Sequence, residues 1–241
     1  MRSYVLATAM FLTLTVSTAH AGPFDLLKDL MVKEPSKNVS ALDDKTAVAG
    51  LKEALAVGTK NAIKSVSQAD GYMGNSMIKI PLPDHLQKMA DIAARMGFQK
   101  QVDNLIVSMN RAAEAAAPKA SGLFVQAIKE MTVDDAKGIL RGGETAATEF
   151  FEKKTSTKLY DEFKPVVSAN MNKVGVARAY KDMMEPLKMV PFVQKESVDL
   201  DHYVTNKALN GLFLMIGEEE KKIRTNPAAR VTDLLKKVFG S

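Results

Sequence analysis

Apolar residues recur at three- and four-residue intervals along most of this 241-residue chain. In the segment from 47 to 66, for example, Leu51, Leu55, Ile63 and Val66 fall on one face of a single long helix. The same spacing returns in most later segments, and no repeat or change of composition marks a second domain. We therefore predict an all-α fold, a single-domain irregular multi-helix bundle of about nine to ten helices.

One stretch, DGYMGNSMIKIPLP at residues 70–83, departs from the helical period. Its Asp-Gly pair is typical of a turn, and the alternation of Ile78 and Ile80 allows a short strand near residues 77–81. Two prolines restrict that strand to a sheet edge or make the stretch a loop, because proline cannot donate a backbone hydrogen bond. The sequence thus predicts at most one short extended segment.

Several residues predict where helices begin and end. Gly97 follows an amphipathic segment and is expected to end it. Thr132 and Asp135 have the spacing of a capping box, with aspartate in place of the usual glutamate. A further helix is expected to begin near Thr155 and to bend at Pro165, where one bond of the helical ladder is missing.

The first residues have the organisation of a secretory signal peptide. Arg2 supplies the positive charge, and Tyr4 to Val16 is mostly apolar but shorter than the roughly 20 residues that span a bilayer. Small residues at Ala19 and Ala21 predict cleavage between Ala21 and Gly22. We expect a periplasmic protein, with an extracellular location as the alternative.

This prediction divides the chain into three parts. Residues 1–21 are the cleaved signal peptide, residues 22–45 a short N-terminal helix and linker, and residues 46–241 the all-α domain. Short amphipathic helices are expected at 24–32 and 227–239. No transmembrane segment is expected in the mature chain.

Charge and cysteine content exclude several classes of function. Removing the signal peptide leaves 32 basic residues against 28 acidic ones, a net charge of +4, and these charges are spread along the chain. Such a pattern does not indicate a nucleic-acid partner. The chain has no cysteine, so disulfides, a thiolate nucleophile and cysteine-based metal sites are excluded.

Two helices carry polar residues at the edge of their apolar faces. On the alanine-rich segment NRAAEAAAPKA, Arg111 and Glu114 have the spacing of an ion pair, which is either exposed or buried in a structural network. Lys207 and Tyr203 lie similarly in a later helix. We hypothesise that one polar cluster inside the bundle, structural or ligand-binding, gathers these side chains: Asn110, Arg111, Glu114, Asp134, Asp135, Tyr203 and Lys207.

The segment LRGGETAATEFF raises the question of an anion site. It has neither the spacing nor the preceding strand of a phosphate-binding loop. We favour a plain helix-turn-helix, in which a glycine supplies the left-handed residue that ends the first helix. The alternative is an anion held by the free N–H groups of the next helix together with Arg141, Thr145 and Thr148.

No catalytic or metal-binding motif is present. His85 and His202 lie in unrelated contexts without the spacing of a metal-ligand pair, and there is no G-x-S-x-G nucleophile elbow. The run GEEEKKIR, with Glu220 and Arg224 four residues apart, is typical of a solvated, salt-bridged helix end. We expect no cofactor and no metal.

Several phrases in the sequence resemble an exported proteobacterial family known as domain of unknown function 4197. They occur in this order between about Leu51 and Gly240: GLKEAL, IPLPDHLQK, MNRAAEAAAPKA, MTVDDAKGIL, GGETAATEFFEKKT, YVTNKALNGLF and EEEKKIRTNPAARVTDLLKKVFG. The resemblance implies a secreted or periplasmic helical protein, and it supplies no reaction, cofactor or catalytic residue.

The function expected from the sequence is that of a non-enzymatic binding or structural protein, with a small molecule or a protein as its partner. Two alternatives stay open. One is a carrier that holds an apolar or lipid-like ligand between its helices, where pockets of bundles usually form. The other is a carboxylate-dependent hydrolase, with Glu114 as the residue to test.

Overall fold

The computed structural model of this protein describes residues 44–173, 175–189 and 199–226. The chain divides into two compact units, Met1–Ala41 and Leu42–Ser241, and every described residue belongs to the second. The predicted signal peptide lies outside the described residues.

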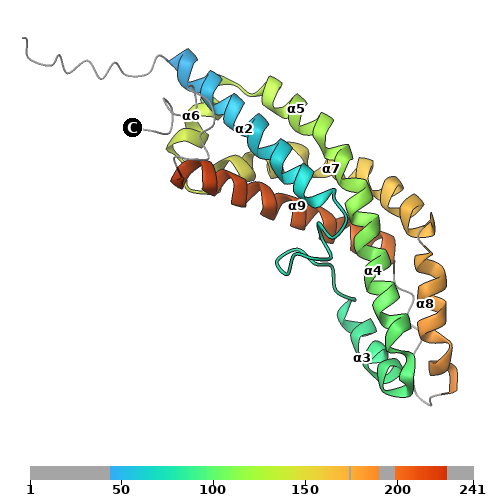
Figure 1. Cartoon of the computed structure of the whole chain (residues 1–241). Helices are drawn as coiled ribbons and strands as arrows, with labels where there is room; N and C mark the ends of the chain where they lie inside the picture. The colour runs from blue at the N-terminus through green and yellow to red at the C-terminus, as the bar shows by residue number, and fades with distance from the viewer. Residues whose placement is uncertain (1–43, 174, 190–198, 227–241) are drawn as a thin grey trace, which may run out of the picture. The chain divides into compact units, whose positions relative to one another are not determined.

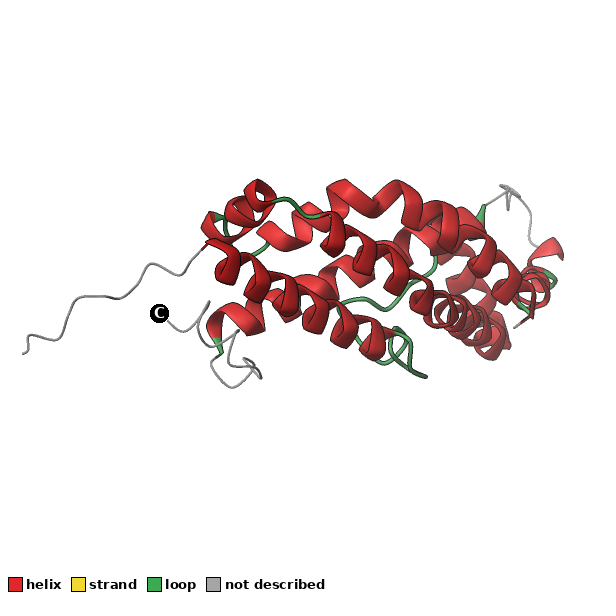
Figure 2. Ribbon diagram, turned by 90° about the horizontal axis from the view of Figure 1, so that it is seen from above, coloured by secondary structure: helices red, strands yellow, loops and turns green. Residues whose placement is uncertain are grey.

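All regular elements in the described part of the chain are helices (Figure 2). The α-helices are α2 (Asp44–Val66), α3 (Asp84–Ala93), α4 (Gln99–Ala116), α5 (Ala120–Glu130), α6 (Val133–Arg141), α7 (Ala146–Lys173), α8 (Val176–Met184) and α9 (Leu200–Thr225). Shorter helical turns are a π-turn at Ala94–Phe98 and 3-10 turns at Ala117–Lys119 and Pro186–Met189. The all-α prediction is confirmed.

The number of helices is smaller than the nine to ten predicted. Six of those described have ten residues or more, namely α2, α3, α4, α5, α7 and α9. The helices predicted at 24–32 and 227–239 lie outside the described residues. Within the described part, α7 is continuous over 28 residues where two helices were expected. Thr155 lies inside it, with its hydroxyl donating to the carbonyl of Phe151 at 2.6 Å, and the helix continues past Pro165.

The core forms where α9 packs against α2, α4 and α7 (Figure 1). Phe124 of α5 packs edge to face against Phe151 of α7 and Phe213 of α9, with ring centroids 5.1 and 6.2 Å apart. On α4 the small side chains of Ala112 and Ala116 are fully buried. Because alanine lets a neighbouring backbone approach closely, α4 can contact α3, α7, α8 and α9.

Two glycine positions show different reasons for the absence of a side chain. Gly97 has φ of +90° and ends the helical segment before α4, as predicted. Gly142 has φ of −78°, so the expectation of a left-handed residue at the Gly-Gly pair is wrong there. A Cβ at Gly142 would lie 2.5 Å from the Cβ of Ala146. Glycine is needed at this turn because α6 and α7 approach so closely.

The segment from 67 to 83, drawn in teal between α2 and α3, is a series of turns (Figure 1). The described residues contain no strand, so the extended segment allowed near 77–81 does not pair with another strand. The side chains of Tyr72 and Ile78 instead pack against α9, where Gly211 leaves room for them. A Cβ at Gly211 would lie 2.8 Å from the ring of Tyr72 and 3.1 Å from the Cβ of Ile78.

Gly211→Ala is expected to destabilise the protein by about 1–3 kcal/mol, because the added methyl group overpacks a filled contact with a rigid buried ring. Gly138→Ala in α6 is the matched control. No atom lies within 4 Å of a Cβ placed at Gly138, so this change should stabilise the helix by about 0.5–1 kcal/mol. Urea denaturation followed by circular dichroism measures both, and a neutral Gly211→Ala would contradict the close packing of the 67–83 segment on α9.

Candidate functional site

Two carboxylates are buried in the described part of the bundle. Glu114 on α4 is 4% exposed and Glu220 on α9 is 7% exposed. A buried carboxylate is costly unless hydrogen bonds and an opposite charge compensate the loss of water. The hydrogen bonds and ion pairs of these two carboxylates therefore indicate whether they are structural or available to a ligand.

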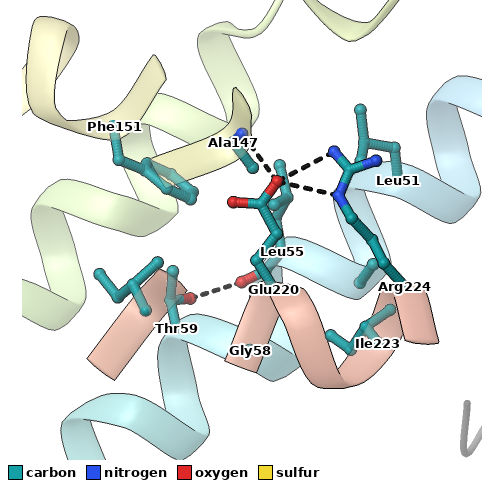
Figure 3. Close-up of a pocket in the computed structure, with 11 residues that line it drawn as sticks. Leu51, Leu55, Gly58, Thr59, Ala147, Phe151, Glu220, Ile223 and Arg224 are labelled. Carbon is teal, nitrogen blue, oxygen red and sulfur yellow. Dashed lines mark hydrogen bonds and ion pairs between the residues drawn. The ribbon is translucent and has the colours of Figure 1, made fainter. Parts of the chain in front are cut away.

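Glu220 meets the first turn of α7 (Figure 3). Its Oε1 accepts a hydrogen bond from the backbone N–H of Ala147 at 2.9 Å. Its Oε2 accepts two bonds from Thr148, from the N–H and from the hydroxyl, both at 2.9 Å. The first N–H groups of a helix have no partner within the helix, and the helix dipole favours an anion there. Glu220 thus caps α7 from another helix.

Arg224, one turn further along α9, completes this centre. Its Nε and Nη2 donate to Oε1 of Glu220 at 3.1 and 2.9 Å, and Nη2 also donates to the carbonyl of Ile139 at 3.0 Å. One carboxylate and one guanidinium therefore connect the end of α6, the start of α7 and α9. The expectation of a solvated helix end is wrong for Glu220, because α7 covers it.

At this turn the protein's own carboxylate occupies the place of the external anion that was the alternative to a plain helix-turn-helix. The N–H and hydroxyl of Thr148 are bound to Glu220. Thr145 is exposed and its hydroxyl donates to Glu149 at 2.9 Å, and Arg141 is exposed. The helix start does bind an anion, but the anion is a side chain, so these three residues do not form a site for an external one.

A small cavity lies between α2 and α9 beside Glu220 (Figure 3). Its walls are mostly apolar and include Leu51, Leu55, Phe151 and Ile223. The volume is about 20 Å³, which is enough for roughly one water molecule. A lipid-like ligand needs several hundred Å³, so this cavity does not support the carrier alternative.

Glu114 fastens the 67–83 segment to α4. Its Oε1 accepts hydrogen bonds from the backbone N–H groups of Tyr72 at 3.1 Å and Met73 at 3.3 Å. Its Oε2 accepts from Nη1 of Arg111 at 2.6 Å, and Nη2 of the same guanidinium lies 2.6 Å from Asp70. The Arg111 side chain is 33% exposed, so the pair combines a buried carboxylate with a guanidinium that reaches the surface. Hydrogen bonds to Glu114 and then Asp70 raise the pKa of Arg111.

Asn110, one residue before Arg111, pairs with the backbone of Ile80. Its Oδ1 accepts from the N–H of Ile80 and its Nδ2 donates to the carbonyl, both at 2.9 Å. A side-chain amide thereby supplies the two bonds that a neighbouring strand would supply. The hydroxyl of Tyr72 donates to the carbonyl of Ala208 on α9 at 2.7 Å. Burial, and then the charge of Glu114, raise the pKa of Tyr72 far above its usual value, so this hydroxyl remains a donor.

Tyr203 and Lys207 contribute to the same region from α9 but do not join the polar interior. The hydroxyl of Tyr203 donates to the carbonyl of Pro81 at 3.1 Å, and burial raises its pKa. Lys207 is exposed, and its Nζ lies 5.7 Å from the centre of the Tyr203 ring. No ion pair joins Lys207 to a carboxylate of the described residues.

Asp134 and Asp135 lie at the start of α6, apart from the contacts of Glu114. Asp134 is exposed. Asp135 forms the predicted capping box, in which the N–H of Asp135 donates to the Thr132 hydroxyl and the N–H of Thr132 donates to Oδ2 of Asp135, both at 3.1 Å. Hydrogen bonds from Thr132 lower the pKa of Asp135. The hypothesis of one cluster is therefore wrong, since only Asn110, Arg111 and Glu114 act together.

His85 and His202 are both exposed. His202 Nδ1 is 2.6 Å from the hydroxyl of Tyr160. Within residues 44–173, 175–189 and 199–226, no three His, Asp or Glu side chains gather closely enough to hold a metal ion. In the same ranges, every buried side-chain nitrogen or oxygen has a hydrogen-bond partner.

An open groove of about 480 Å³ runs between the N-terminal half of α7 and α9. Phe213 and Leu214 supply its apolar part, and Leu214 is 42% exposed. Gly217 adds no side chain to the lining, and the hydroxyl of Thr148 would lie 3.6 Å from a Cβ placed there. The charged residues of the lining are four glutamates and one lysine: Glu144, Glu149, Glu152, Glu218 and Lys221. The groove therefore carries a net charge of −3.

Fold and contacts together define a class of protein: a helical bundle whose buried carboxylates accept hydrogen bonds from its own backbone. None of its described helices is long and apolar enough to cross a membrane. The chain belongs to the family described as "Protein of unknown function (DUF4197)", whose sequence profile matches residues 41–240. This match confirms the resemblance to that family. No curated protein and no solved structure gives a significant match to the chain.

Glu220→Gln is expected to destabilise the protein by about 3 kcal/mol, because the amide turns an NH₂ group toward backbone donors and removes the buried negative charge that the guanidinium of Arg224 binds. Glu162→Gln, at an exposed position of α7, is the matched control and should stay within about 0.5 kcal/mol of the wild type. Chemical denaturation measures both. Equal stabilities of the two variants would show that Glu220 does not bind α7 as described.

Proposed function

We propose that this protein is an exported, non-catalytic binding protein, and that its binding surface is the groove between α7 and α9. The observation that carries the proposal is the exposure of Leu214, 42%, inside a groove whose lining also contains four glutamates and one lysine. Apolar surface within a hollow and rimmed by polar side chains is a feature of binding grooves, and here Leu214 adjoins Phe213 inside such a rim.

The environment of the buried carboxylates favours binding over catalysis. Glu114 accepts two backbone N–H bonds and one from Arg111, while Glu220 accepts bonds from α7 and Arg224. A general acid or base must reach a substrate proton, and these oxygens are occupied by the protein's own donors. This arrangement argues against the carboxylate-dependent hydrolase.

A photo-crosslinking amino acid at position 214 is expected to yield one discrete protein adduct in living cells, identified by mass spectrometry. The same amino acid at Val125, which is 45% exposed on α5 outside this groove, is the control. Adducts at both positions with the same pattern, or none at 214, would contradict the groove as the binding surface.

Export predicts a mature chain that begins at Gly22. Mass spectrometry of the protein from its native cells should give the mass of residues 22–241, and cell fractionation should recover it outside the cytoplasm. An intact chain beginning at Met1 in the cytoplasmic fraction would contradict this part of the proposal.

A further inference from the structure

We infer that the partner bound by the α7/α9 groove is a cationic amphipathic α-helix of another protein. This inference rests on the proposed function and adds the chemical class of the partner. Its basis is the combination of an apolar floor, an acidic wall on the α7 side and helical geometry within one groove.

The dimensions of the groove fit a helix of a few turns. On α9 the lining extends from Asn210 to Lys221, a length of about 17 Å at 1.5 Å per residue, which is about three helical turns. Both walls are helices, and a third helix can place a ridge of side chains between them. Helix binding in grooves uses apolar anchors at intervals of three and four residues, which would contact Phe213 and Leu214 here.

Gly217 and Thr148 mark the place where an anchor side chain would enter most deeply. Glycine contributes no side chain, and the neighbouring threonine hydroxyl is turned to Glu220. The space above Gly217 is therefore bounded by small groups and by the apolar surface of Leu214. Such a depression accommodates an aliphatic side chain without a hydrogen-bonding group.

The net negative charge of the groove lining favours a positively charged partner. Glu144, Glu149 and Glu152 line the α7 side, Glu218 lines the α9 side, and Lys221 is the single cation of the lining. The full sequence carries a net charge of +5, so this acidic groove differs in sign from the chain as a whole. Lysine or arginine beside an apolar stripe would complement the three glutamates of the α7 wall and Glu218 of α9, and would steer the encounter.

Other classes of partner fit the groove less well. Anionic lipid and nucleic acid carry negative charge and would be repelled by its four glutamates. A metal ion needs converging carboxylates, and no such group of three occurs among the residues described. A cationic helix satisfies both the charge and the apolar floor.

Fluorescence anisotropy with labelled synthetic peptides tests this inference on the full chain. The probe is a 14-residue helical peptide with leucines along one face and lysines on both flanks. Two control peptides replace lysine by glutamate or scramble the order of the same residues. The cationic amphipathic peptide is expected to bind at least about tenfold more tightly than either control, and more weakly as salt is raised.

Protein variants locate the binding. Leu214→Ser, and the pair Glu149→Lys with Glu152→Lys, are each expected to weaken binding at least about tenfold. The control pair Glu130→Lys with Glu162→Lys makes the same charge change at exposed positions outside the groove and should alter affinity by less than about twofold. Circular dichroism verifies that each variant remains folded.

Several results would overturn the inference. One is that the anionic or the scrambled peptide binds as tightly as the cationic amphipathic peptide, or more tightly. Another is that the groove variants bind the cationic amphipathic peptide with unchanged affinity. Sedimentation velocity that shows a dimer abolished by Leu214→Ser would identify a second copy as the occupant instead. Failure of all peptides, together with a discrete adduct from position 214 in cells, would reject the cationic helix while leaving the binding function in place.

Discussion

The contact between the carboxylate of Glu220 and the start of α7 is the interaction on which the arrangement around α9 depends. A helix that begins inside a bundle exposes N–H groups without partners, and leaving them unpaired in the interior is costly. The carboxylate satisfies the N–H groups of Ala147 and Thr148, and Arg224 balances its charge while binding the end of α6. The same few atoms thus position three helices.

A comparable solution holds the longest non-helical segment of the described chain. The turns from 67 to 83 lie against the core, where backbone groups cannot all reach water. Glu114 and Asn110 on α4 bind the N–H of Tyr72 and both backbone groups of Ile80, and α9 accepts the Tyr72 hydroxyl. Side chains replace the strand partner that this segment lacks, which explains why it remains irregular. Buried polar residues that are fully bonded specify one arrangement of the backbone.

Local sequence patterns were sufficient wherever the controlling interaction is local. Helical periodicity predicted the all-α fold, Gly97 the end of a helix, and the spacing of Thr132 and Asp135 a capping box. The pairing of Arg111 with Glu114 was also readable, because both residues lie on one helix. By contrast, Glu220 and Arg224 occur in a charge run typical of solvated helix ends. The carboxylate of Glu220 is buried because it contacts Thr148 of α7, which lies 72 residues earlier in the chain. Lys207 was assigned by hypothesis to the polar cluster but is exposed, because its direction depends on the rotation of α9, which sequence spacing does not determine.

The proposed binding function depends on these contacts, because the hydrogen bonds of Glu220 hold α7 against α9, and these two helices form the walls of the groove.

Amide hydrogen exchange at Ala147 and Thr148, followed by NMR, tests the interaction of Glu220 with the start of α7 most directly. First-turn amides of a helix ordinarily exchange rapidly, since they lack intrahelical partners. If Glu220 binds them in the interior, both should exchange as slowly as the amides in the middle of α7. Exchange at the rapid rate of a free helix end would contradict the account.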